Sequence, residues 1–180
     1  RMSPKPDAAW LEAQYNNRAR VPQSAEYLQR WANDSARVRR ERPCVLDLPY
    51  GDGPGEALDV FPAAQPGAPV LVYIHGGWWR ALDKSDGSFV APAFTDAGAM
   101  VVVPNYSLCP AVTIGHIALQ MAQALAWVWR HAPRYGGDRS RIVVAGHSAG
   151  GHLAAIALRR WSGAGERCEP APAAMLRLAA

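Results

Sequence analysis

The sequence predicts an α/β fold in which helices cover both faces of a mostly parallel central sheet. Three segments, 70–74, 99–103 and 142–145, are continuously apolar and rich in β-branched residues, which is typical of strands buried on both faces. Between the last two, apolar residues recur at helical spacings of three and four: Ile114, Ile117, Met121, Leu125 and Val128. A helix that joins two such strands forms a βαβ crossover, and these sheets bind ligands at the carboxyl ends of their strands.

The part of the chain before the sheet is expected to be helical. Residues 8–20 and 24–39 indicate two polar helices, and Ser24 is a candidate N-cap of the second. We therefore divide the chain into an N-terminal helical, cap-like segment over residues 1–42 and a sheet-forming core over residues 43–180.

Shorter strands are expected beside the buried ones. Segments 44–48 and 58–61 are strand-like, and a turn rich in glycine over 51–55 separates them. Their polar interruptions suit the outer strands of a sheet. The last residues, 175–180, resemble the start of another strand.

Composition and charge exclude several classes of protein. The chain has 180 residues, 19 Lys and Arg, and 15 Asp and Glu, which fits one domain of small positive charge. Its apolar runs are far shorter than the about 20 residues of a membrane-spanning helix. The four arginines within 37–42 are expected at the solvated end of a helix, and no nucleic-acid motif accompanies them. We expect no nucleic-acid partner and no membrane span, and we leave a homo-oligomer open.

The cysteines and the cofactor motifs are equally informative. Cys44, Cys109 and Cys168 are widely spaced and form no C-x-x-C pair, so we expect neither a disulfide framework nor structural zinc. A reducing, cytoplasmic location follows as the expectation. The sequence contains no H-E-x-x-H, P-loop or G-x-G-x-x-G motif, so we expect no metal and no cofactor.

A G-x-S-x-G motif follows the third buried strand. Residues 146–151 are Gly-His-Ser-Ala-Gly-Gly, and the helix-compatible run 152–160 comes next. In this strand–turn–helix context the motif predicts a sharp turn that presents the Ser148 hydroxyl above the sheet as a nucleophile. The helix would direct its free N–H groups to the same point and favour negative charge there. An ordinary β–α turn is the alternative.

A second motif follows the first buried strand. Residues 75–79 are His-Gly-Gly-Trp-Trp, and small residues at that place free backbone N–H groups to point into a site. In acyl transfer such groups hold the developing oxyanion. We assign this oxyanion hole to the amides of Gly77 and Trp78, with Ala149 as the third donor, and Gly76 stays a candidate.

Together these motifs resemble the α/β-hydrolase fold, and within it the esterases related to hormone-sensitive lipase. The arylformamidase (kynurenine formamidase) branch is most similar: Trp79 is the discriminating feature, since typical lipase-like members carry a third glycine in that loop. Residues 105–110 resemble the Y-x-L-x-P segment of this group, and residues 15–18 resemble a stretch before the core of bacterial members. The resemblance implies a serine hydrolase acting on small esters or N-formyl aryl amides, with 43–180 forming the N-terminal part of its core.

Aromatic residues near the motifs are candidates for the substrate pocket. Trp78 and Trp79 lie in the loop beside Ser148, where loop aromatics supply contact area at low entropic cost. We expect at least one of them in the pocket, with core packing as the alternative for each. His147 and Tyr106 complete the candidate pocket.

The acid and the base of a catalytic triad are harder to find. After Ser148 the carboxylates are Glu166 and Glu169, and the later histidine is His152, one helical turn on and poorly placed for Ser148. We interpret His152 as structural, His75 and His147 as supports of their loops, and His116 and His131 as surface residues. The expectation is that the 180 residues are an N-terminal portion of a hydrolase, with acid and base beyond Ala180. A ligand-binding member of the fold without catalysis is the alternative.

Overall fold

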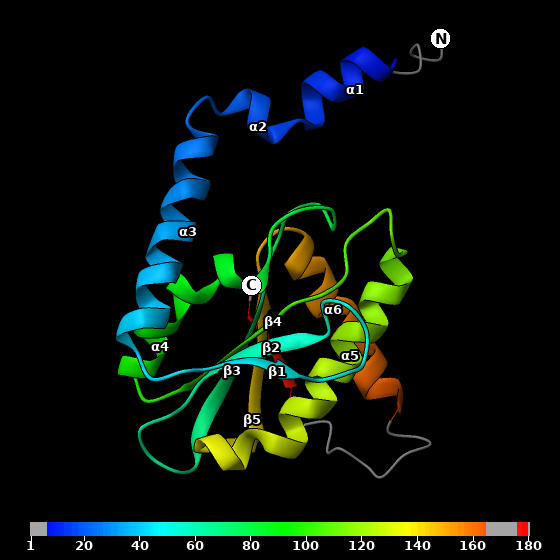
Figure 1. Cartoon of the computed structure of the whole chain (residues 1–180). Helices are drawn as coiled ribbons and strands as arrows, with labels where there is room; N and C mark the ends of the chain where they lie inside the picture. Colours follow the sequence, from blue (N-terminus) through cyan, green and yellow to red (C-terminus); the bar gives the residue numbers. More distant parts are fainter. Residues whose placement is uncertain (1–6, 165–175, 180) are drawn as a thin grey trace.

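A computed structural model describes residues 7–164 and 176–179 of the chain. Its centre is a mixed sheet with the strand order β1-β2-β4-β3-β5-β6 (Figure 1). The strands pair in parallel from β4 to β6, whereas β1–β2 and β2–β4 are antiparallel. The strands are β1 (Val45–Pro49), β2 (Ala57–Phe61), β3 (Ala68–Ile74), β4 (Met100–Pro104), β5 (Gly137–Gly146) and β6 (Leu176–Ala179).

Helices lie on both faces of this sheet, as the sequence predicted. On one face α5 (Ile114–His131) and α6 (Ala149–Ala164) bury their apolar stripes against β3, β4 and β5. On the other face α3 (Ser24–Glu41) and the short α4 (Ala91–Asp96) pack over a smaller cluster that includes Phe61. The central strands are therefore buried on both sides, which explains their unbroken apolar sequences.

The N-terminal segment differs from its prediction in detail. The helix expected over 8–20 is interrupted at Asn16, and two helices result, α1 (Ala8–Tyr15) and α2 (Asn17–Arg20). Figure 1 shows both extending away from the sheet, and α1 buries none of its residues. Ser24 is the first residue of α3 rather than its N-cap, because its hydroxyl donates to the carbonyl of Arg18 instead.

Polar contacts attach α3 to the connection between β3 and α4. That connection contains the 3₁₀ turns η1 (Lys84–Asp86) and η2 (Ser88–Val90). Arg39 donates to the carbonyl of Ser85 and to the hydroxyl of Ser88, and Arg42 forms an ion pair with Asp96. The expectation that these arginines are merely solvated is therefore corrected for Arg39, whose half-buried contacts fasten the helix to the core, whereas the pair of Arg42 with Asp96 is exposed.

The last strand of the sheet lies where the sequence predicted it. The expected strand over 175–180 is present as β6, which pairs in parallel with β5, Ile142 opposite Leu176. Cys44 and Cys109 are free thiols, and Cys168 lies outside the described residues. Within the described ranges, no helix has both the length and the apolar character that crossing a membrane would require.

Candidate active site

Three loops meet at the carboxyl ends of β3, β4 and β5, the edge at which a parallel sheet holds its ligands. The loop after β3 carries His75 to Trp79, the loop after β4 begins with Asn105 and Tyr106, and the turn after β5 carries Ser148. The topology thus gathers the residues that the two sequence motifs singled out.

Ser148 occupies a sharp turn between β5 and α6. Its φ of 54° lies in the left-handed region, which costs a non-glycine residue about 1–3 kcal/mol and persists only where the surroundings enforce it. The neighbours do so here, since His147 N–H donates to the carbonyl of Ile74 (3.2 Å) and Gly150 N–H donates to the carbonyl of His147 (2.8 Å). A Cβ on Gly150 would collide with the carbonyl oxygen of Ile74. The result is an exposed serine side chain directly before a helix.

The loop after β3 folds tightly against this turn. Gly77 has a φ of 105°, and Trp78 and Trp79 also adopt left-handed conformations. The N–H groups of Arg80 and Ala81 both donate to the carbonyl of Gly77 at 3.0 Å. Gly76 passes so close to the serine turn that a Cβ there would lie 2.8 Å from the carbonyl oxygen of His147. Only glycine allows this approach.

The amides of the two loops are available for a ligand. Among the residues that the structure describes, none accepts a hydrogen bond from the N–H groups of Gly76, Gly77, Trp78 or Ala149. Ala149 also begins α6, so the positive end of the helix dipole lies beside Ser148. This arrangement favours a negatively charged oxygen next to the serine.

A buried polar cluster supports the loop from below. The imidazole of His75 stacks on the ring of Tyr106, with centroids 4.2 Å apart and planes 8° from parallel. Its Nδ1 lies 2.9 Å from the carbonyl oxygen of Gly76, and its Nε2 lies 3.1 Å from Oδ1 of Asn105. Burial lowers the pKa of His75, although these two acceptors oppose that shift. Asn105 is itself fixed by Asp83, whose carboxylate accepts from Nδ2 at 2.6 Å.

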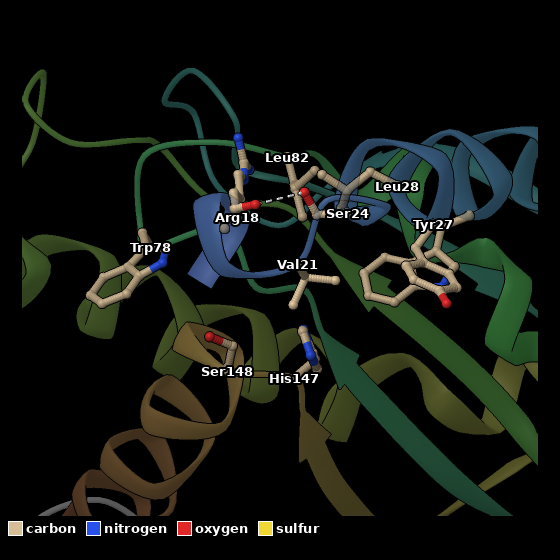
Figure 2. A pocket seen from close by; sticks show the side chains of 11 residues that line it. Arg18, Val21, Ser24, Tyr27, Leu28, Trp78, Leu82, His147 and Ser148 are labelled. Atoms are coloured by element: carbon tan, nitrogen blue, oxygen red, sulfur yellow. Dashed lines mark hydrogen bonds between the residues drawn. The ribbon is translucent and has the colours of Figure 1, made fainter. Parts of the chain in front are cut away.

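A cavity of about 270 Å³ opens above Ser148 (Figure 2). Trp78, which is 51% exposed, and His147 line it. Trp79 and Tyr106 do not line it: Tyr106 is buried, and the half-buried Trp79 packs against the core and against His152. The full lining is Arg18, Val21, Ser24, Tyr27, Leu28, Trp31, Gly77, Trp78, Leu82, His147 and Ser148.

Most of the cavity lining was missed by sequence reasoning. Six of its residues come from α2, from α3 and from the connection between them, and Figure 2 shows Val21 lying above Ser148 and His147. The stretch over 15–18 was noted for its resemblance alone. The aromatic residues of α3, Tyr27 and Trp31, were the available signal, because a polar helix has little reason to carry them unless they cover something.

The histidines of the chain do not engage Ser148. Its hydroxyl has no hydrogen-bond partner among the described residues. His152 is exposed, and its ring meets Trp79 edge to face at 5.2 Å. His131 is half-buried rather than on the surface, stacked on Trp127 at 4.4 Å, whereas His116 is exposed as expected. Within the described ranges, no three His, Cys, Asp or Glu side chains gather to hold a metal ion.

Comparison with known sequences places these features in a family. The BD-FAE family model matches residues 58–161, more than half of the chain. Kynurenine formamidase of Danio rerio is 34% identical over 124 residues, which are 68% of this chain and 41% of that protein. Esterase LipQ of Mycobacterium tuberculosis is 37% identical over 125 residues, which are 66% of this chain and 30% of that protein. The chain spans about two fifths of these relatives or less.

Solved structures agree with the architecture. A proposed thioesterase from Silicibacter sp. TM1040 is 34% identical with a TM-score of 0.80, over 93% of this chain and 61% of that chain. Esterase B from Lactobacillus rhamnosis has a TM-score of 0.65 at 22% identity, over 86% of this chain and 55% of that chain. At that identity the second likeness concerns the fold alone. These likenesses confirm the fold that the sequence predicted.

Proposed function

The chain belongs to the BD-FAE family and has the α/β-hydrolase fold, and on this basis we propose that it carries the nucleophile and the oxyanion-binding amides of a serine hydrolase. Small carboxylic esters and N-formyl aryl amides are the proposed substrates. Relatives named kynurenine formamidase and esterase support both classes. One observation carries the proposal: Ser148 stands on an enforced left-handed turn, beneath a cavity and beside four amides without an acceptor among the described residues.

The proposed reaction proceeds through an acyl-enzyme. A general base takes the hydroxyl proton as Ser148 Oγ attacks the carbonyl carbon, and the carbonyl oxygen becomes an oxyanion. Amides of Gly77, Trp78 and Ala149, with Gly76 as a further candidate, hold that charge. The C–O or C–N bond then breaks, and the leaving alcohol or amine takes the proton from the base. Water, activated by the same base, next attacks the acyl carbon, releases the acid and restores the serine.

We propose that the base is a histidine outside these 180 residues, oriented by a carboxylate that also lies outside them. His152 follows Ser148 by one helical turn and faces Trp79, and His147 has its ring against Trp31. Neither forms a hydrogen bond with Ser148 Oγ in the part of the chain that the structure describes. The greater length of the relatives supports this placement.

Ser148→Ala in the complete protein tests the nucleophile. We expect loss of hydrolysis of p-nitrophenyl acetate and of N-formyl aryl amines, with unchanged unfolding, because the side chain is exposed. A fluorophosphonate should label Ser148, losing fluoride as the Oγ–P bond forms. Ser140→Ala, at an exposed serine of β5, is the matched control and should keep both activity and labelling. Undiminished turnover by the Ser148 variant would overturn the assignment.

A second candidate function is ligand binding without turnover. The lack of a histidine bonded to Ser148 among the described residues favours it, since the cavity and the amides would still bind a carbonyl compound. The two functions separate in one measurement on the complete protein. Binding of an aryl ester that stays intact over hours supports the receptor-like function, and release of its alcohol supports the hydrolase.

The proposed location of the protein in the cell rests on its cysteine thiols. Cys44 and Cys109 are both free, which supports a reducing, cytoplasmic location. We propose that the protein acts on small molecules without a cofactor, and a homo-oligomer stays open.

A further inference from the structure

Tyr106 lies beneath the loop after β3 and contacts two consecutive carbonyl groups. Its hydroxyl donates to the carbonyl oxygen of His75 at 2.9 Å and to that of Gly76 at 3.0 Å. The side chain is 2% exposed, so water does not compete for these carbonyls. Burial raises the pKa of Tyr106, and the hydroxyl therefore keeps its proton over the whole working range of pH.

The geometry of the peptide unit turns this contact into an orientation. In a trans peptide the C=O of one residue and the N–H of the next point in opposite directions. The carbonyl of His75 shares its peptide unit with the N–H of Gly76, and the carbonyl of Gly76 shares its unit with the N–H of Gly77; both bonds are trans. Because both carbonyls point down to the Tyr106 hydroxyl, both N–H groups point up, away from the core.

Ser148 lies near that upper side. A Cβ on Gly76 would be 3.3 Å from Cβ of Ser148, and Ser148 lines the cavity together with Gly77, the residue after Gly76. From this geometry we propose that Tyr106 is a positioning residue that aims the amides of Gly76 and Gly77 at the oxyanion formed on the substrate of Ser148. This inference rests on the proposed hydrolase function. It gives Tyr106 a role below the loop in place of the expected role in the pocket.

The cluster around Tyr106 is built to hold this orientation. One hydroxyl proton cannot bind two carbonyls at full strength, and the His75 ring supplies a second contact to the carbonyl of Gly76 at 2.9 Å. Asn105 holds that ring through Oδ1, which also accepts from the N–H of Lys84 at 3.2 Å. Asn105 and Tyr106 directly follow β4, and the N–H of Asn105 donates to β2 at Ala57 (2.9 Å). The loop thus rests on the rigid end of the sheet.

Loss of the hydroxyl should act on the transition state more than on substrate binding. Amides that are already aimed stabilise the oxyanion without reorganisation, and removing one such donor outright costs about 10²–10³ in kcat. Tyr106→Phe keeps the donors and the ring stack but releases the two peptide units. We expect kcat to fall about tenfold to a hundredfold, with KM within a factor of about three.

The control is a second buried tyrosine with the same type of bond. The hydroxyl of Tyr50, which is 8% exposed, donates to the backbone carbonyl of Asn105 at 2.8 Å and forms no hydrogen bond with His75, with Gly76 or with the Asn105 side chain that holds the His75 ring. In the complete protein, Tyr106→Phe and Tyr50→Phe are compared in kcat, KM and affinity for an aryl trifluoromethyl ketone, which mimics the tetrahedral intermediate. We expect similar losses of stability, but a loss of kcat and a parallel loss of ketone affinity in Tyr106→Phe alone.

The outcomes are decisive in both directions. Equal kcat losses in the two variants, or a Tyr106 loss below threefold, would overturn the inference. If Tyr106→Phe does not fold, Asn105→Ala replaces it, because it frees the His75 ring; an unchanged kcat there would also overturn the inference.

Amide exchange rates of Gly76 and Gly77 supply a readout that needs no activity. If Ser148→Ala shows that the proposed function is wrong, changed exchange in Tyr106→Phe still supports the orientation, and unchanged exchange refutes it.

Discussion

The indole of Trp31 meets the imidazole of His147 edge to face, with ring centroids 5.5 Å apart. Trp31 belongs to α3, and His147 directly precedes Ser148. The same indole stacks on Phe89 at 5.5 Å, and Phe89 meets Tyr73 of β3 at 6.4 Å. A series of four aromatic rings therefore runs from Tyr73 of the sheet through Phe89 to Trp31 of the N-terminal segment, and ends at His147 in the serine turn. The segment is part of the cavity, and its packing sets the space above Ser148.

Trp31→Ala should alter the choice of substrate more than the chemistry. The change removes one wall of the cavity and the two aromatic pairs of Trp31, and each such pair contributes about 0.5–1.5 kcal/mol beyond its buried area. We expect KM for p-nitrophenyl benzoate to rise about three- to tenfold, while kcat/KM for methyl acetate changes less. Steady-state kinetics with both esters check this. Trp10→Ala, at a 50% exposed tryptophan of α1 outside the cavity lining, should leave both esters unaffected. An equal loss for both esters in Trp31→Ala would contradict the expected role.

Gly77→Ala should disrupt the loop after β3 through collision as well as strain. A Cβ at Gly77, with φ of 105°, would strike the carbonyl of Ala81. Gly98→Ala is the matched control, because Gly98 has φ of 88° with nothing within 4 Å of its Cβ position. Strain alone costs about 1–2 kcal/mol, so we expect that loss for Gly98 with normal activity. For Gly77 we expect a larger loss of stability and at least tenfold lower kcat, roughly the cost of misplacing an oxyanion donor. Urea unfolding and esterase assays compare the Gly77 and Gly98 variants. Equal losses of stability and of kcat in both would show that backbone strain, and not the collision with Ala81, causes the effect.

The sequence predicts the architecture well where its signals are local. The runs at 70–74, 99–103 and 142–145 became β3, β4 and β5, because unbroken apolar β-branched runs have few alternatives to a doubly buried strand. The G-x-S-x-G motif and the His75 loop likewise carry their geometry in adjacent residues. Their glycines stand where other backbone comes too close for a side chain.

The sequence does not predict which distant residues meet. Tyr106 follows a strand beside the site, yet no local pattern tells whether its ring enters the pocket or lies under the neighbouring loop. Val21, Tyr27 and Trp31, which cover the cavity, come from α3 and the connection before it, more than a hundred residues before Ser148. The sequence also does not predict the break at Asn16. Its side chain accepts a hydrogen bond from the N–H of Ala19, and this contact begins α2 and interrupts an otherwise helical pattern.

Lys84 should be the most sensitive charged residue of the described core. Its ammonium lies 2.7 Å from both Asp59, which is completely buried, and Asp47, and it fastens the loop after β3 to β1 and β2. Oδ2 of Asp59 has no partner among the described residues. Lys84→Met would therefore leave a buried carboxylate unpaired, which costs about 3–5 kcal/mol. Urea unfolding at pH 8 measures the loss. Asp96→Asn, at an exposed pair with Arg42, should change stability little, and equal losses would contradict this reasoning.

The ion pairs of Lys84 with Asp47 and Asp59 also predict that the free energy of unfolding decreases at alkaline pH. Burial opposes the charged form of Lys84, but the hydrogen bonds and charges of Asp47 and Asp59 outweigh it and hold the pKa of Lys84 above its usual value. The folded protein thus binds this proton more tightly than the unfolded chain does. The resulting stability is fully present below the unfolded pKa, about 10.4, and is lost as pH rises through the higher folded pKa. We expect the difference in unfolding free energy between the natural protein and Lys84→Met to be constant from pH 7 to 9 and to shrink above about 10.4. A difference that stays constant to higher pH would show that the ion pair is not its source.

Small aryl substrates should be preferred over long acyl chains. The cavity above Ser148 holds about 270 Å³, at the lower end of ordinary ligand pockets, and aromatic side chains of Tyr27, Trp31 and Trp78 line it. An aryl ring can fill this space by stacking, whereas a long acyl chain would leave most of its length in water and gain little from the pocket. We expect kcat/KM to decrease from N-formylkynurenine to a short p-nitrophenyl ester and then to a p-nitrophenyl ester of a long-chain acid. Assays of the complete protein at one pH, each corrected by the Ser148→Ala variant, give this order. If the long-chain ester exceeds the formamide by more than tenfold, the proposed arylformamidase-like substrate class is wrong and a lipase-like one takes its place.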